Sequence, residues 1–153
     1  MAGQSMTPRQ VIDHLIAFDT TSRYSNMELI HWVADYLKGW GIESSLSRGE
    51  DDKKANLFAT LGPVGDGGIV LSGHTDVVPV GNEAGWTVDP FGAEIIDDVL
   101  YGRGATDMKG AIACFVEAVS RFVNRRGKNF SGSISLLITG DEEGPSINGT
   151  RKV

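Results

Sequence analysis

Three short polar stretches carry the residue types that bind divalent metal ions. The first spans residues 72–76 (SGHTD) and contains His74 and Asp76, the second spans residues 104–110 (GATDMKG), and the third spans residues 139–144 (TGDEEG). A neutral imidazole together with several carboxylates is a ligand set that suits zinc or a similar divalent ion. The three stretches therefore predict a metal site if the fold brings them together.

His74 and Asp76 lie two residues apart, a spacing that puts both side chains on one face of an extended segment. A histidine that binds a metal needs an acceptor for its other ring nitrogen, and a nearby carboxylate can supply it. Asp76 is a candidate for this role, either toward His74 or toward a neighbouring group. The alternative is an ordinary polar turn that happens to contain a histidine and an aspartate.

Glu142 and Glu143 are adjacent acids that directly follow an apolar run. Like charges in a partly dry site disfavour ionisation, so the pair needs a neutralising cation or full solvation. With a metal present, one glutamate can bind the ion while the other accepts a proton from metal-bound water, whose pKa the ion lowers. The alternative is a solvated acidic turn. Asp141 is expected to cap this turn.

Asp107 also has two interpretations. It could be an acid in the first turn of a helix, where it would suit the helix dipole. The surrounding glycines, Gly102, Gly104 and Gly110, instead favour a close approach of the backbone at this point. A carboxylate there could bridge two ions, which in two-metal sites lie roughly 3.5–4 Å apart.

The elements around these stretches predict how they meet. An apolar strand over residues 69–72 precedes His74, a strand over 133–139 precedes the glutamate pair, and a helix over 107–126 lies between them. A strand, helix and strand in this order predict a βαβ unit with the ligands at the carboxyl ends of its strands. The helix is the strongest prediction, since apolar residues keep helical spacing along its length. These are Ile112, Phe115, Val116, Val119, Phe122 and Val123.

Further elements are expected on both sides of this unit. Helices are predicted from Thr7 and Pro8 onward, over residues 27–38, and from about Ser146. Strands are predicted over residues 42–47 and 55–61, with a hairpin formed by residues 94–96 and 99–101.

The bulk composition narrows the possible functions. The chain has 153 residues, enough for about one domain, and a formal net charge of -6 without a basic stripe, which disfavours nucleic acid as a partner. Its apolar runs are too short to span a bilayer, and the residues from Met1 to Pro8 lack the features of a signal peptide. The single cysteine, Cys114, is expected to be a small core residue. These features favour a cytoplasmic protein without membrane partners.

The three ligand stretches also resemble the motifs of a known family. Residues 72–79 (SGHTDVVP), 102–110 (GRGATDMKG) and 140–144 (GDEEG) closely resemble the signatures of the M20 family of dinuclear zinc amidohydrolases and peptidases. The resemblance covers essentially the whole chain. It implies a zinc-peptidase-like α/β fold, a three-layer sandwich with a mostly parallel central sheet, of which this chain would form the N-terminal part.

The resemblance also implies a role for each candidate residue. His74 would bind one zinc ion, Asp107 would bridge both ions, and Glu143 would bind the second. Glu142 would be the general base, and Asp76 would orient His74. One or two zinc ions are expected, with Co²⁺ or Mn²⁺ as possible substitutes. The family further implies a cis peptide bond between Asp107 and Met108.

Two members of the family compete as models for the substrate. Residues 18–23 (FDTTSR) and 55–60 (ANLFAT) look like acetylornithine deacetylase, whereas residues 100–104 (LYGRG) and 141–150 (DEEGPSINGT) look like succinyl-diaminopimelate desuccinylase. The resemblance thus implies hydrolysis of the amide of an N-acyl amino acid, N-acetylornithine or N-succinyl-diaminopimelate, in arginine or lysine biosynthesis. A chain that mixes the two could also be a chimera.

The sequence departs from the family in one respect that bears on activity. Family members are more than twice as long, and they carry a further acidic zinc ligand after the glutamate pair and a histidine ligand near the C-terminus. No Asp, Glu or His follows Glu143 here. Residues 1–153 are therefore expected to form a partial catalytic domain without the lid and dimerisation domain, and to associate as a homo-oligomer. The alternative function is a catalytically silent module that binds a divalent ion weakly or not at all.

Overall fold

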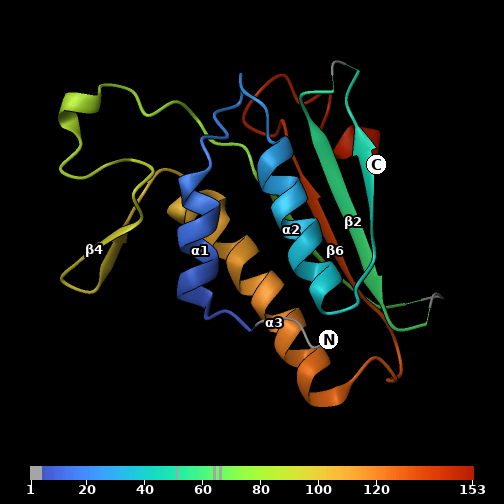
Figure 1. The fold of residues 1–153 in the computed structure, drawn as a ribbon. Helices are drawn as coiled ribbons and strands as arrows, with labels where there is room; N and C mark the ends of the chain where they lie inside the picture. The colour runs from blue at the N-terminus through green and yellow to red at the C-terminus, as the bar shows by residue number, and fades with distance from the viewer. Residues whose placement is uncertain (1–4, 51, 64, 66) are drawn as a thin grey trace.

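A computed structural model describes residues 5–50, 52–63, 65 and 67–153, so part of the N-terminal segment used above to judge localisation lies outside it. Three α-helices pack on a four-stranded sheet, and a small hairpin projects from this body (Figure 1). The helices are α1 (Pro8–Ala17), α2 (Met27–Gly39) and α3 (Gly110–Arg126). The sheet contains β1 (Ser44–Arg48), β2 (Ala55–Leu61), β3 (Ile69–His74) and β6 (Ile134–Thr139). The hairpin consists of β4 (Glu94–Ile96) and β5 (Val99–Tyr101).

The strand order confirms the predicted βαβ unit and corrects the predicted sheet. In the order β1-β2-β6-β3, strands β3 and β6 are parallel neighbours joined through α3. The other two pairings, β1 with β2 and β2 with β6, are antiparallel. The expectation of a mostly parallel sheet is therefore wrong for the described strands. The connection from β1 to β2 is too short for the crossover that a parallel pair requires.

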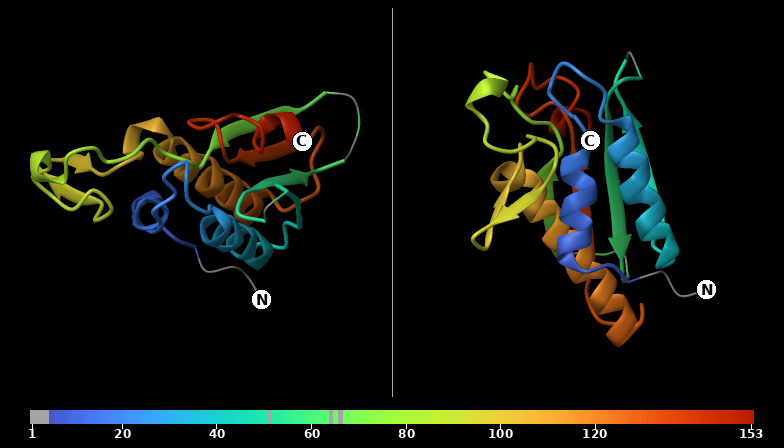
Figure 2. Two further views of the ribbon diagram at one scale, coloured as in Figure 1. Left: turned by 90° about the horizontal axis from the view of Figure 1, so that it is seen from above. Right: turned by 60° about the vertical axis from the view of Figure 1, so that its left-hand side comes forward.

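The layers also differ from the expected three-layer sandwich. Seen from above, α1, α2 and α3 all lie on one side of the sheet (Figure 2). The described residues place no α-helix on the opposite face. Two layers of the expected three are therefore present in the part of the chain that the structure describes.

Of the three α-helices, α1 and α2 begin where their sequences predict, and the third is an exception. The side chain of Thr7 accepts a hydrogen bond from the backbone N–H of Gln10, and the side chain of Gln10 accepts one from the backbone N–H of Thr7, which forms a capping box ahead of Pro8. The exception is α3, which begins at Gly110 rather than at Asp107. Residues 105–109 form a wide turn in which Asp107 (φ -126°, ψ 101°) is not helical. Asp107 is therefore not an acid in the first turn of α3.

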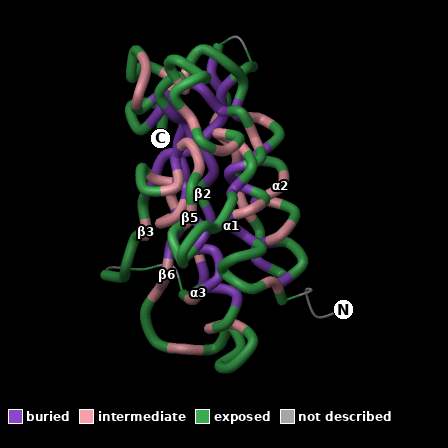
Figure 3. The backbone as a smooth tube through the Cα atoms, turned by 90° about the vertical axis from the view of Figure 1, so that its left-hand side faces the viewer, coloured by how far each residue is buried: buried purple, intermediate pink, exposed green. Residues whose placement is uncertain are grey.

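The core lies between the three helices and the inner face of the sheet. Figure 3 shows the buried positions along the centre of the molecule, with exposed positions in the loops and outer turns. Each helix contributes one apolar face, as its periodicity predicts. The most enclosed side chains come from all three helices and both central strands: Leu15, Ile16, Leu29, Ile30, Leu37, Leu57, Ile112, Leu136 and Ile138.

Strand β3 is less buried than its composition predicts. Ile69 and Val70 are 63% and 57% exposed, because β3 forms an edge of the sheet and none of the described helices covers its outer side. Cys114 is exposed as well and is not the predicted core residue. The helix predicted near Ser146 is reduced to a single short turn at Thr150–Lys152. None of the described helices is both long and apolar enough to cross a membrane.

Candidate metal centre

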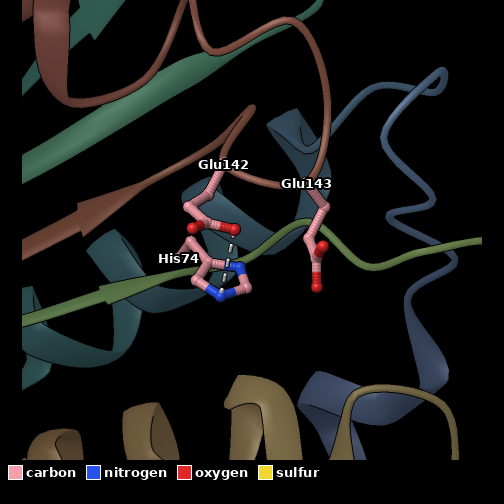
Figure 4. A group of neighbouring side chains, drawn as sticks. All are labelled: His74, Glu142 and Glu143. Atoms are coloured by element: carbon pink, nitrogen blue, oxygen red, sulfur yellow. Dashed lines mark ion pairs between the residues drawn. The ribbon is translucent and has the colours of Figure 1, made fainter.

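Two neighbouring strand ends bring the first ligand candidates together. His74 is the last residue of β3 and lies opposite Thr139, the last residue of β6, in the parallel register. Glu142 and Glu143 follow β6 after a tight turn, so they return over the same sheet edge. Ligand atoms of His74, Glu142 and Glu143 all lie within 4.8 Å of one another (Figure 4). The predicted meeting of these stretches is therefore confirmed.

Asp107 reaches the same point from the turn before α3. Its Oδ1 lies 2.9 Å from Nε2 of His74, and Oε2 of Glu142 lies 3.8 Å from that nitrogen. The peptide bond between Asp107 and Met108 is cis, as the family resemblance implies. The side chains of Asp107 and Glu142 are 70% and 61% exposed, whereas His74 is nearly buried. One imidazole thus faces several accessible carboxylates.

Asp76 holds this group together in a way that the sequence does not reveal. Its fully buried carboxylate accepts hydrogen bonds from the backbone N–H of Glu142 (3.0 Å) and the backbone N–H of Glu143 (2.9 Å). The hydroxyl of Ser22 donates a third bond of 2.9 Å to the same group. Toward His74, the closest acceptor is the backbone carbonyl of Asp76, 3.0 Å from Nδ1, with the carboxylate at 3.6 Å. The Asp76 side chain therefore fixes the glutamate turn first and the imidazole second.

The electrostatics of His74 and Asp76 are mutually reinforcing. The Asp76 side chain raises the pKa of His74 to about 9 against the opposing effect of burial, with help from the Asp76 carbonyl and from Asp107. Burial alone would raise the pKa of Asp76, but hydrogen bonds from His74, the N–H of Glu142, Ser22 and the N–H of Glu143 outweigh it. The pKa of Asp76 falls to about 2. Near neutral pH the ion-free centre therefore holds an imidazolium beside a carboxylate.

Glu143 is in a less favourable position as an anion. Desolvation raises its pKa, and the negative charges of Asp107 and Glu142 raise it further. A cation would relieve this repulsion. The donor set of one imidazole nitrogen and several carboxylate oxygens fits zinc, and it also fits other divalent ions that accept mixed nitrogen and oxygen ligands.

A buried polar network supports the strand end behind His74. The hydroxyl of Thr20 donates to the carbonyl of Thr75 (2.6 Å), and the hydroxyl of Thr75 donates to the carbonyl of Thr139 (3.0 Å). The amide of Asn26 donates to both the hydroxyl of Thr75 and the carbonyl of Ala55 (2.9 Å each). These bonds tie β3 to β6, to β2 and to the segment between α1 and α2. Sequence reasoning missed them, because the partners are far apart along the chain.

Lys109 is a buried lysine next to the candidate site, and its role was not predicted from the sequence. It is fully buried beside the wide turn that carries Asp107, and its ammonium donates to the carbonyl of Phe18 at 2.7 Å. Burial lowers its pKa to about 8, while the charge of Asp19 opposes this shift. The bond joins the Asp107 turn to the end of α1. In the sequence, the role of Lys109 is marked only by its position two residues after Asp107.

Asp141 takes the role that the sequence predicts, and His14 lies apart from the ligand candidates. Asp141 adopts a positive φ of 68°, and its Oδ2 accepts the backbone N–H groups of Ile147 (2.9 Å) and Asn148 (2.8 Å). It therefore organises the turn after β6, as predicted. His14 on α1 stacks against Trp32 at 5.0 Å, away from the ligand candidates.

Known proteins share both the sequence motifs and the fold. The profile of peptidase family M20/M25/M40 matches residues 70–153, just over half of the chain, and includes all three ligand stretches. A succinyl-diaminopimelate desuccinylase from Rhodospirillum centenum is 64% identical over 98 residues, which are 64% of this chain and 25% of that protein. The desuccinylase of Methylobacterium radiotolerans is 55% identical over 125 residues, 79% of this chain and 31% of that protein. The chain thus spans about a quarter to a third of the length of these curated relatives.

Solved structures resemble this chain in fold at lower sequence identity. Human carnosine dipeptidase 1 superimposes with a TM-score of 0.75 and 28% identity, covering 92% of this chain and 33% of the dipeptidase. An M20 family metallo-carboxypeptidase from Sulfolobus solfataricus has a TM-score of 0.78 at 20% identity, covering 90% of this chain and 31% of that protein. The second likeness concerns the fold alone.

Proposed function

This chain belongs to peptidase family M20/M25/M40, and on that premise we propose that it forms the metal-binding part of a hydrolase that cleaves the amide of an N-acyl amino acid. One observation carries the proposal. His74, Glu142 and Glu143 converge at the ends of two parallel strands, within 4.8 Å of one another, and Asp107 contacts His74 from a third segment.

The names of the curated relatives favour one substrate class. Both relatives described above are succinyl-diaminopimelate desuccinylases, which supports an N-succinylated diamino acid as substrate and a role in lysine biosynthesis. Residues 18–23 and 55–60 resemble acetylornithine deacetylase, so N-acetylornithine and a role in arginine biosynthesis form the second candidate. Both are small-molecule N-acyl amino acids, and the same centre would serve either.

We assign the residues of the centre two roles, metal ligand and general base. His74, Asp107 and Glu143 would hold the metal. A zinc ion held there supplies Lewis acidity toward the amide carbonyl and lowers the pKa of water. Co²⁺ or Mn²⁺ could replace zinc on the same donors.

Glu142 is the proposed general base. Its carboxylate is exposed and lies on the same side of the centre as His74 Nε2, where it can take a proton from the attacking water and pass it to the leaving amine. Its backbone is fixed by the bond from its N–H to Asp76, so the base is held from a buried anchor. Asp76 acts as a positioning residue for both glutamates and for the imidazole.

The test compares variants of the metal-loaded chain. Hydrolysis of N-succinyl-diaminopimelate and N-acetylornithine would be followed by amine release, and zinc binding by calorimetry. We expect Glu142→Gln to abolish hydrolysis while zinc still binds, and His74→Ala to remove zinc binding. Glu28→Gln on the outer face of α2 is the matched control and should change neither.

Two results would contradict the proposal. Hydrolysis that survives in Glu142→Gln would show that Glu142 is not the general base. Zinc binding that is unchanged in His74→Ala would show that the ion binds elsewhere. Zinc binding with no hydrolysis of either substrate by the parent chain would favour the silent module instead. Analytical ultracentrifugation of the same samples would test the predicted homo-oligomer.

A further inference from the structure

A cavity of about 450 Å³ opens beside the metal centre and is not used by the chemistry described above. Its wall includes Glu143, so it shares a boundary with the ligand cluster. The rest of the wall comes from Pro79, from the turn after β6, and from two further segments, the one before α2 and the residues just before β2. These two segments contribute three cations, Arg23, Lys53 and Lys54.

Arg23 is the cation best prepared to receive an anion. Its guanidinium carbon lies 4.6 Å from the centroid of the Tyr24 ring, and its Nη2 donates to the Tyr24 hydroxyl at 3.1 Å. No carboxylate within the described ranges lies at ion-pair distance from Arg23. A guanidinium that stacks on a ring and lacks an acid partner presents a planar set of donors that fits a carboxylate.

The loop that carries Arg23 is anchored to the glutamate turn. Ser22, its neighbour, donates its backbone N–H to the carbonyl of Val77 at 3.0 Å and its hydroxyl to Asp76 at 2.9 Å. The same Asp76 carboxylate holds the backbone of Glu142 and Glu143. One buried residue therefore sets the position of both the metal ligands and the cationic loop.

The charges of the cavity wall favour an anion once the metal centre is filled. Two acids, Asp141 and Glu143, oppose the three cations. Asp141 is already satisfied by the N–H groups of Ile147 and Asn148. Glu143 would be neutralised by a bound ion. The wall then carries more cationic than anionic side chains beside the candidate metal centre.

We propose that this cavity is a carboxylate subsite, in which Arg23 binds an anionic group of the N-acyl amino acid substrate. This inference rests on the proposed function for the identity of the substrate. The carboxylate could belong to the acyl side, as in a succinyl group, or to the amino acid side. Either would be held while the amide lies at the metal centre.

The test measures ligand binding with and without zinc and does not depend on hydrolysis. The ¹⁵N-labelled chain would be titrated with succinate and with succinamide, its neutral analogue, while backbone amide shifts are followed. We expect succinate to shift signals of residues 21–24 and 143–148, and succinamide to leave them in place. Arg23→Gln should weaken succinate binding about tenfold, whereas Arg126→Gln, an equal charge change at the far end of α3, should not.

Two further probes distinguish the sources of the carboxylate. N-succinyl-butylamine carries its carboxylate on the acyl side, and N-acetylalanine carries it on the amino acid side. The probe whose affinity falls in Arg23→Gln but not in Arg126→Gln identifies the side that the subsite receives.

Shifts that are equal for succinate and succinamide, or equal losses in Arg23→Gln and Arg126→Gln, would overturn the subsite. If the chain binds zinc through His74 and hydrolyses its substrate but does not bind succinate, the subsite is refuted and the proposed function stands. If the chain binds succinate through Arg23 but hydrolyses neither substrate, the proposed function is refuted and the anion-binding site stands.

Discussion

The buried and exposed halves of the candidate metal centre are held in different ways. His74 and Asp76 form the buried half, in which the protein itself supplies partners for Nδ1 of His74 and for both carboxylate oxygens of Asp76. Asp107 and Glu142 form the exposed half, and their carboxylates contact little besides the imidazole and the solvent. The buried half can be in place before an ion arrives, because the protein itself supplies the partners. The exposed half needs the ion to bring its charges together.

The largest expected effect comes from removing the anchor of the buried half. In Asp76→Ala, two backbone N–H groups and the Ser22 hydroxyl lose their acceptor inside the protein, and His74 loses its carboxylate neighbour. We expect a loss of about 3–5 kcal/mol in the free energy of unfolding, measured by urea denaturation. Asp107→Ala is the matched control in the exposed half. Equal losses in the two variants would refute the distinction between the halves.

A second effect should appear as pH dependence of the metal-free chain. The pKa of His74 is about 9 in the folded protein against an ordinary value of 6.5. Because the folded state raises this pKa, its stabilisation is complete below pH 6.5 and is lost as the pH rises through 9. The loss should approach about 3 kcal/mol in the free energy of unfolding.

Zinc should reverse that dependence, since the ion binds the deprotonated imidazole. Zinc affinity is expected to rise with pH by up to about tenfold per unit below pH 9. Urea denaturation and zinc titration at several pH values would measure both trends, with His74→Gln as the control that removes them. A metal-free chain whose stability is flat between pH 6.5 and 9 would contradict the assigned environment of His74.

A smaller effect is expected at the edge of the buried half. Ser22→Ala removes one of the hydrogen bonds to Asp76 and leaves the two backbone bonds in place. We expect a loss of about 1 kcal/mol at neutral pH. The pKa of Asp76, about 2 in the parent chain, should rise, so that the stability lost on acidification is lost at a higher pH. Acid denaturation would detect this shift, and Ser131→Ala on an exposed loop should show none.

The smallest effect on stability is expected in the exposed half. Asp107→Asn should change the free energy of unfolding by no more than about 0.5 kcal/mol, since its side chain faces solvent. The same variant should lower zinc affinity at least tenfold, measured by competition with a chelator, because a charged ligand is lost. A stability loss as large as that of Asp76→Ala would show that both halves are structural.

The sequence predicted the parts of the fold that depend on local patterns. Strand β2 has the predicted bounds, and the spacing of the βαβ unit placed His74 and the glutamates at one sheet edge. The expected mostly parallel sheet was wrong for the pairings of β1 and β2, because strand composition does not reveal which neighbour a strand will pair with. The same limit applies to the site. The partners of Asp76 lie 66 and 67 residues away, and no local pattern marks a side chain that binds distant backbone groups.

The role of Asp107 shows how tertiary structure overrides a local pattern. An acid before an apolar periodic run predicts the first turn of a helix. The chain instead makes a wide turn after Gly104, which has a φ of 78°, and the N–H of Lys109 closes that turn on the carbonyl of Gly104 at 2.9 Å. The turn directs Asp107 toward the histidine. The glycines around it were the correct signal, and the helix dipole was the competing one.

The flush ends of β3 and β6 also determine which changes in chain length the molecule can tolerate. His74 lies opposite Thr139, and only two residues separate Thr139 from Glu142. An insertion or deletion at the end of β3, or between Thr139 and Glu142, would move His74 relative to Glu142 by a whole residue. The exposed connection between α3 and β6, around residues 127–132, is separated from the site by the full length of the strands. Lineages of this protein should therefore vary in length at that connection and keep the residue count between strand end and ligand fixed.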